Sequence, residues 1–260
     1  MGHTRLGNLP KTRKWNELVE RIVGEGLIGD VATAAFHVDA IAAETLEASQ
    51  KALDNAAHDS GVLYTFYLLT QVAQASRSSS WESALARHGV HLAGDSTVFD
   101  LTVEVQGAID RYVRGRPSGA TDLSEMAQQS AGEALMSLAG TRTASLFGGS
   151  GTDTRNAIRS LSTKKGFGEL GQRFFGIFVA RFLNFYLSRA TGAGLGSPRL
   201  RDLGDVAEFN KALRTHCDQS ARIVRDFCGE VFKGRVQGGN RSREYVEVSG
   251  GSRQEAAQRT

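Results

Sequence analysis

Proline is scarce in this chain, and no stretch shows the residue alternation of a half-buried strand. Only 3 of the 260 residues are proline. Proline breaks a helix by removing an amide donor and clashing with the preceding turn, so its scarcity leaves long stretches free to be helical. β-branched residues are scattered and do not alternate with polar ones, which gives no reason to expect a sheet.

Cysteine is also scarce. The 2 cysteines, Cys217 and Cys228, fall within one expected helix. Their separation places them roughly 16 Å apart along the helix axis. Two Cα atoms at that distance cannot be joined by a disulfide. We therefore expect two reduced, buried thiols.

Sequence patterns for catalysis and for resident cofactors are missing as well. The chain has no Gly-x-Ser-x-Gly nucleophile elbow and no P-loop lysine after its glycines. His37 and Glu44 share a helix face but have no third metal ligand, and His88 and His91 have no acidic neighbours at metal-ligand spacing. These absences predict a non-enzymatic protein without metal or cofactor.

Long apolar runs are absent too. The longest, residues 174–187, is interrupted by Arg181 and Asn184. A membrane-spanning helix needs about 20 apolar residues. The first residues lack the apolar core of a secretory signal. We therefore expect a cytoplasmic protein without a transmembrane segment.

What the sequence does contain is a helical pattern of apolar residues. Its 40% hydrophobic and 23% charged residues are ordinary for a globular protein with a sizeable core. Apolar side chains recur every three or four positions, which predicts an all-α, multi-helix globular bundle of about 7–9 helices. Residues 1–11 read as an extended N-terminal arm, 12–234 as a single helical domain and 235–260 as a flexible polar tail. The expected helices include a short one that is capped by Thr12 and ends at Gly24 or Gly26, then 30–57, 61–76, a short one around Trp81, 96–114, one starting at Thr121, 155–162, 168–190 and 205–233.

Two of these helices carry informative faces. Residues 168–190 are apolar on nearly all sides, which is typical of a buried core helix. Their remaining stripe, Gly176, Ala180, Asn184 and Ser188, is spaced by four and suggests one close helix neighbour. The 205–233 helix is amphipathic, and its expected buried face includes Phe227 and Val231.

Charge is segregated along the chain. Residues 28–110 carry 3 basic and 11 acidic side chains, a net charge of −8, whereas residues 111–201 carry 13 basic and 5 acidic ones, a net charge of +8. One interpretation is that the halves pack against each other or alternate head-to-tail in an assembly, with opposite fields steering association. The other is that the basic half contacts phosphate.

A glycine-rich loop at 148–151 is the best candidate for an anion site. It leads into an expected short helix whose N-terminus exposes free amides, and cations follow. A plain connector is the alternative. The candidate anion-binding residues are Gly149, Gly151, Arg155, Arg159, Lys164 and Lys165.

The N-terminal arm is the second candidate. It is rich in basic residues and glycine, and it reaches Trp15. It is expected either to dock onto a partner chain or to fold back over its own core, with nucleic-acid binding as a further alternative. The candidate docking residues are His3, Arg5, Leu6, Leu9, Arg13 and Trp15.

These features support three functional hypotheses. The first is a non-enzymatic helical interaction, oligomerisation or adaptor protein of a bacterial multi-component system, with stress response or phage defence as examples. The bacterial origin is suggested by the preference for Arg over Lys. The second is a nucleic-acid or nucleotide-binding protein that uses the basic 142–173 region. The third is a membrane-active effector that uses the 168–190 helix.

Overall fold

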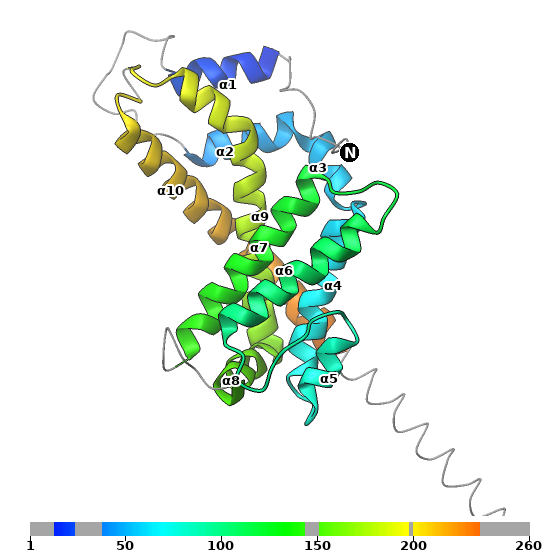
Figure 1. Ribbon diagram of the computed structural model, residues 1–260. Helices are drawn as coiled ribbons and strands as arrows, with labels where there is room; N and C mark the ends of the chain where they lie inside the picture. Colours follow the sequence, from blue (N-terminus) through cyan, green and yellow to red (C-terminus); the bar gives the residue numbers. More distant parts are fainter. Residues whose placement is uncertain (1–12, 24–37, 144–150, 198–199, 235–260) are drawn as a thin grey trace, which may run out of the picture.

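The computed structural model describes residues 13–23, 38–143, 151–197 and 200–234, and within them every regular element is a helix (Figure 1). The predicted all-α globular bundle is thus confirmed. In chain order the helices are α1 (Arg13–Val23), α2 (Val38–Ala48), α3 (Gln50–Ala56), α4 (Ser60–Ala75), α5 (Trp81–Ala86), α6 (Val98–Arg114), α7 (Asp122–Ala139), the 3-10 helix η1 (Gly140–Arg142), α8 (Gly151–Leu161), α9 (Lys164–Ala193) and α10 (Leu203–Ser220). A further helical stretch covers residues 222–234.

The first of two expected long helices is divided at Ser49. The Ser49 hydroxyl donates a hydrogen bond to the Thr45 carbonyl at 2.5 Å, and the Ser49 backbone leaves helical geometry with φ −107° and ψ 11°. Serine side chains that bond back to the preceding turn bend helices. The expectation of one continuous helix over 30–57 is therefore wrong at Ser49, and residues 30–37 lie outside the described part.

The second division falls at Ala221, between α10 and the 222–234 stretch. Ala221 has φ −68° and ψ −5° and still donates its amide to the Cys217 carbonyl at 2.9 Å. The single helix expected over 205–233 is therefore wrong. Alanine is the best helix former, so no local signal announces this bend. The bend resets which side chains of the following stretch face inward.

Helix starts are fixed by side-chain caps, and one cap joins two helices. Asp59 precedes α4, and its Oδ1 accepts hydrogen bonds from the amides of Gly61 (2.9 Å) and Val62 (3.0 Å). Its Oδ2 accepts a hydrogen bond from the hydroxyl of Thr121 at 2.7 Å. Thr121 in turn caps α7, as the sequence predicts. The N-termini of α4 and α7 are thereby held together.

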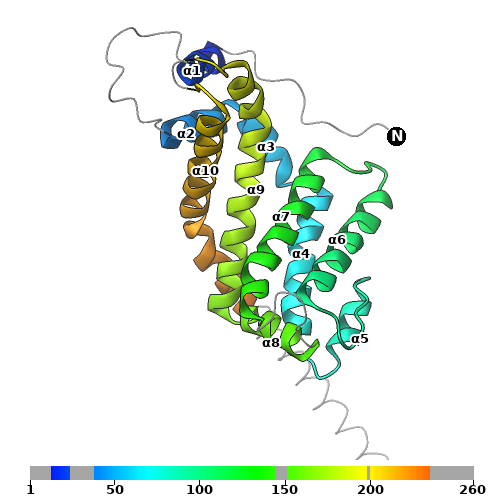
Figure 2. The ribbon, with the colours of Figure 1, turned by 60° about the vertical axis from the view of Figure 1, so that its left-hand side comes forward.

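The core is built around α9, the long helix through the middle of the bundle (Figure 2). It packs against α1, α2, α7, α8 and α10, while α4 packs against α6 and α7 on the other side of α7. Its buried side chains include Phe174, Phe178, Phe182 and Tyr186. The prediction that this segment is a buried core helix is confirmed. In the views, α1 and α2 gather at one end of α9, and α5 and α8 at the other.

Candidate functional site

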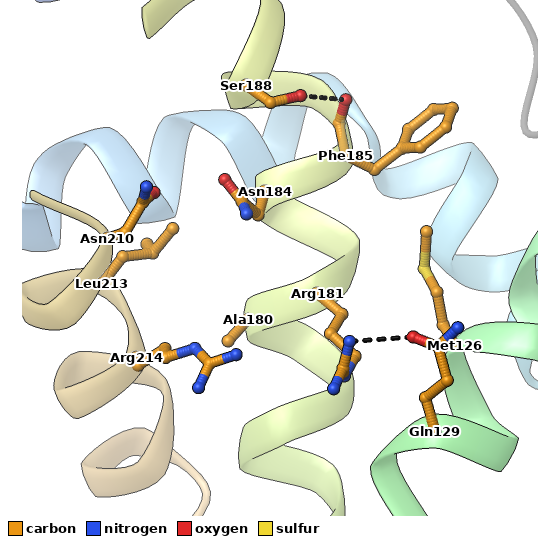
Figure 3. Close-up of a pocket in the computed structure, with 10 residues that line it drawn as sticks. All are labelled: Met126, Gln129, Ala180, Arg181, Asn184, Phe185, Ser188, Asn210, Leu213 and Arg214. Atoms are coloured by element: carbon orange, nitrogen blue, oxygen red, sulfur yellow. Dashed lines mark hydrogen bonds between the residues drawn. The ribbon is translucent and has the colours of Figure 1, made fainter. Parts of the chain in front are cut away.

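Two adjoining cavities follow α9 where it lies between α7 and α10. One, of about 290 Å³, is called here the amide cavity; the other, of about 340 Å³, is called the cationic cavity. Both are lined by Ala180 and Arg214, so the two cavities adjoin, and together they are called here the α9 groove. Figure 3 shows the amide cavity with its walls from α7, α9 and α10.

The groove opens because the neighbour of α9 approaches closely at one end only. A side-chain carbon on Gly168 would lie 2.6 Å from the Arg225 carbonyl oxygen, and one on Gly176 would lie 2.9 Å from the Asp218 Cα. Only glycine permits such contacts. Further along α9, Asn184 and Ser188 are exposed and line the amide cavity. The predicted close neighbour is thus present at Gly176, whereas the other end of the small stripe forms the groove floor.

A carboxylate from α7 connects the groove walls. Glu133 Oε2 accepts a hydrogen bond from Arg181 Nη2 of α9 at 2.8 Å, and its Oε1 accepts one from Arg214 Nη1 of α10 at 3.3 Å. Arg181 Nη1 also donates to Gln129 Oε1 at 2.9 Å, as drawn in Figure 3. The longer Arg214 contact, and the 60% exposure of the Arg214 side chain, leave this guanidinium freer to turn than Arg181.

The cationic cavity has a second such link. Arg173 of α9 donates to Asp218 Oδ1 of α10 at 3.2 Å and to the Ser137 hydroxyl of α7 at 3.3 Å. Lys211 and Arg222 line the same cavity, and neither has an ion-pair partner within the described ranges. The groove therefore brings together five cationic side chains and two carboxylates. Their sum favours an anion.

The amide cavity combines polar and apolar walls. Asn184 on the α9 floor and Asn210 on the α10 wall are its amide side chains, and Phe185, Met126 and Leu213 are among its apolar lining residues (Figure 3). Two buried polar atoms of residues that line this cavity, Arg181 Nε of α9 and Asn210 Oδ1 of α10, have no hydrogen-bond partner among the described residues. Buried polar atoms are nearly always paired, so this is a place where a bound group would supply missing hydrogen bonds.

A separate surface feature is an exposed apolar stripe on the 222–234 stretch. Ile223, Phe227 and Val231 are spaced by four and are 86%, 70% and 37% exposed. Phe227 and Val231 were expected on the buried face, and that expectation is wrong. After the bend at Ala221, Cys228 and Phe232 turn inward in their place, at 2% and 1% exposure.

The candidate anion residues around the glycine loop do not converge on one point. Gly149 lies outside the described residues. Gly151 is the first residue of α8, earlier than expected, and a side-chain carbon there would lie 2.0 Å from the Gly94 carbonyl oxygen. Arg155 donates to the Ser76 (3.2 Å) and Ser78 (2.5 Å) carbonyls at the end of α4.

The remaining cations of that candidate site point elsewhere. Arg159 and Lys165 are exposed, and Lys164 pairs with Glu230 of the 222–234 stretch. The pair raises the Lys164 pKa, chiefly through its hydrogen bond. Anion binding by this region remains a prediction.

Of the docking arm, only two candidate residues are described. Trp15 is buried, at 4% exposure, and meets Tyr186 edge-on with ring centroids 6.3 Å apart. Trp15 therefore packs against α9 of its own chain. Arg13 is exposed and pairs with Glu17 at 2.7 Å. His3, Arg5, Leu6 and Leu9 lie outside the described residues.

Cys217 and Cys228 are both buried and free, as predicted. Burial raises the pKa of each thiol from 9.0 to about 11. In the described ranges, no group of three or more His, Cys, Asp or Glu side chains is arranged to hold a metal ion. No described helix is long and apolar enough to cross a membrane.

No family model matches the chain, and neither a curated protein nor a solved structure matches it. The function is therefore inferred from the α9 groove and from the exposed apolar stripe of the 222–234 stretch. Sequence reasoning missed both as sites. A signal for the groove was present in Arg181 and Asn184, the two polar residues that interrupt the longest apolar run.

Proposed function

We propose that the protein is a non-enzymatic helical interaction protein that assembles with further copies of itself through the stripe formed by Ile223, Phe227 and Val231. The observation that carries the proposal is the exposure of these three side chains on one helix face. Large apolar side chains gathered on one face favour association, because contact removes them from water.

The charge layout supports a second copy as the occupant. Of the described ion pairs, those that join residues 28–110 to residues 111–201 are Arg111 with Glu104 and Arg114 with Asp110, both within α6. Three basic side chains of α9, Lys164, Arg173 and Arg181, pair with Glu230, Asp218 and Glu133, and Arg142 of η1 pairs with Glu169. Two copies attract each other when the acidic region of one meets the basic region of the other.

The stripe alone is too small for a stable interface, which commonly takes about 20–30 residues on each side. The acidic region also exposes apolar side chains, Phe99 and Val103, beside Asp100 and Glu104 on α6. This mixed face of α6 is the counterpart that we propose for the stripe, with Arg222 and Arg225 beside Ile223 opposite its carboxylates. A head-to-tail contact of this kind gives rings or filaments rather than a closed dimer.

Solution mass tests the proposal. Wild type is expected to sediment with a mass above 28.0 kDa. Ile223→Asp combined with Phe227→Asp places charge on the stripe and is expected to give the monomer mass. Leu203→Asp is the matched control, because Leu203 is 74% exposed on α10 outside the stripe and should leave the mass unchanged. A monomeric wild type, or a doubly substituted variant that assembles like wild type, contradicts the proposal.

The cellular setting of the assembly is part of the same proposal. A bacterial multi-component system, such as a stress response or phage defence, and a cytoplasmic location fit an adaptor with two reduced thiols. The membrane-effector alternative has less support, because the phenyl groups of α9 that would have to meet lipid, such as Phe178, are buried.

A further inference from the structure

We propose that the α9 groove binds a nucleotide, with its phosphate in the cationic cavity and its base in the amide cavity. This site is separate from the self-assembly stripe, and the inference does not depend on the proposed function. The site is also distinct from the glycine-loop candidate and from the N-terminal arm, because none of the candidate residues of either lines the groove.

The cationic cavity has the chemistry of a phosphate site. Lys211 and Arg222 have no ion-pair partner within the described ranges, and both line this cavity beside Arg173. Arg214 has only a 3.3 Å contact to Glu133. A phosphate accepts charge-assisted hydrogen bonds from several such groups at once, and guanidinium groups suit its geometry.

The amide cavity has the chemistry of a base site. Side-chain amides each carry a donor and an acceptor, so Asn184, Asn210 and Gln129 can meet the mixed donor and acceptor edge of a nucleobase. Leu213 supplies an aliphatic surface for the base plane, and Phe185 and Met126 line the α7 side of the cavity (Figure 3). A simple anion such as phosphate would leave these groups, and the unpaired Asn210 Oδ1, without partners.

Arg214 lies between the proposed phosphate site and the proposed base site. Arg214 lines both cavities, as does the small side chain of Ala180. A ligand that fills both must be anionic at one end and planar and polar at the other. The cavity volumes of about 290 and 340 Å³ together lie within the usual range for small-ligand sites, about 300–1,000 Å³.

A free nucleotide and the end of a nucleic-acid strand present the same chemistry, and titrations distinguish them. The full chain is titrated by calorimetry with each 5′-nucleoside monophosphate, with adenosine, with inorganic phosphate and with a short single-stranded oligonucleotide. At least one monophosphate is expected to bind about tenfold or more tightly than inorganic phosphate, and AMP more tightly than adenosine. Tighter binding of the oligonucleotide assigns the site to a strand end, and tighter binding of the monophosphate assigns it to the free nucleotide.

Variants locate the site. Lys211→Ala with Arg222→Ala should weaken monophosphate binding by about tenfold or more, and Asn184→Leu should lower the preference for nucleotide over inorganic phosphate. The matched control is Arg159→Ala with Lys165→Ala, which removes two exposed cations from the glycine-loop region and should leave binding unchanged. Thermal unfolding of each variant verifies that it folds.

Two results would overturn the inference. One is the absence of nucleotide and oligonucleotide binding by wild type at millimolar concentration. The other is binding that survives Lys211→Ala with Arg222→Ala, or that is lost instead in the Arg159 and Lys165 control. Because these substitutions lie outside the stripe, either result leaves the solution-mass test of self-assembly unaffected.

Discussion

The two halves of α9 share one helix and one small-residue pattern, yet the first half is covered closely by neighbouring protein and the second half is open. In the first half, Gly168 and Gly176 allow the backbone at Arg225 and at Asp218 to approach the helix closely, and Gly171 leaves room for the Cys228 side chain. In the second half, Ala180, Asn184 and Ser188 form the floor of an open groove. Small residues at helical spacing therefore indicate a surface that a neighbouring group can approach closely. The path of the next helix determines whether that surface is covered by protein or left open as a groove.

The largest effect is expected from filling the close half. Gly168→Leu places a side chain against the Arg225 carbonyl oxygen, so the 222–234 stretch must shift. Overpacking of this kind costs about 1–3 kcal/mol, of which the better helix propensity of leucine offsets part. We expect the free energy of unfolding in urea to fall by about 2 kcal/mol.

The matched control lies in the open half. Ser188→Leu adds the same side chain at an exposed position on the groove floor, where surface substitutions usually change stability by less than about 0.5 kcal/mol. Equal losses in both variants would remove the distinction between the two halves of α9.

An intermediate effect is expected from the carboxylate that connects the groove walls. Glu133→Gln removes the charge that accepts hydrogen bonds from Arg181 and Arg214, leaving two guanidinium groups without a counterion. We expect the free energy of unfolding to fall by about 1 kcal/mol, measured by urea denaturation. Glu17→Gln, in the exposed pair with Arg13, is the control and should produce no measurable change. A Glu133 variant as stable as the Glu17 variant would show that the link contributes nothing.

The smallest effect on stability concerns the two buried thiols, Cys217 and Cys228. Burial raises the pKa values of Cys217 and Cys228 from 9.0 to about 11, so the native protein holds about a hundredfold less thiolate at pH 8 than an exposed cysteine would. Alkylation by iodoacetamide at pH 8 should be correspondingly slow in buffer and fast in urea. Fast alkylation of the native protein would contradict the burial of Cys217 and Cys228.

The same pKa shifts predict how stability depends on pH. The folded pKa lies above the unfolded one, so the unfolded chain loses these protons first as pH rises. Stability from these groups is therefore fully present below about pH 9 and decreases above it.

Much of the fold follows from the sequence, because it depends on local signals. The period of the apolar residues predicts α4, α6, α7 and α9, and Thr121 marks a helix start. The divisions at Ser49 and Ala221 could not be predicted from the sequence, because neither a serine inside a helical pattern nor an alanine is a reliable signal that a helix ends. The error at Ala221 propagates, because a helix that bends presents a different face, and Phe227 moves from expected burial to 70% exposure.

The candidate site could not be predicted for a related reason. Arg181 and Glu133 are 48 positions apart, and Arg214 and Glu133 are 81 apart. Their meeting depends on the paths of α7, α9 and α10, which no single segment encodes. The small stripe on α9 was visible in the sequence, but it could not show where the neighbouring helix departs.

The most direct test of the contrast within α9 is an NMR titration of the wild-type protein with the tightest-binding nucleoside monophosphate. The account predicts that backbone amides of residues 180–188 and 210–214, with the side-chain amides of Asn184 and Asn210, change their chemical shifts. Amides of residues 164–171 and 225–234 should keep their chemical shifts, whereas the amide of Arg222, which lines the cationic cavity, should respond. Shifts concentrated in 164–171, or no shifts at all, would contradict it.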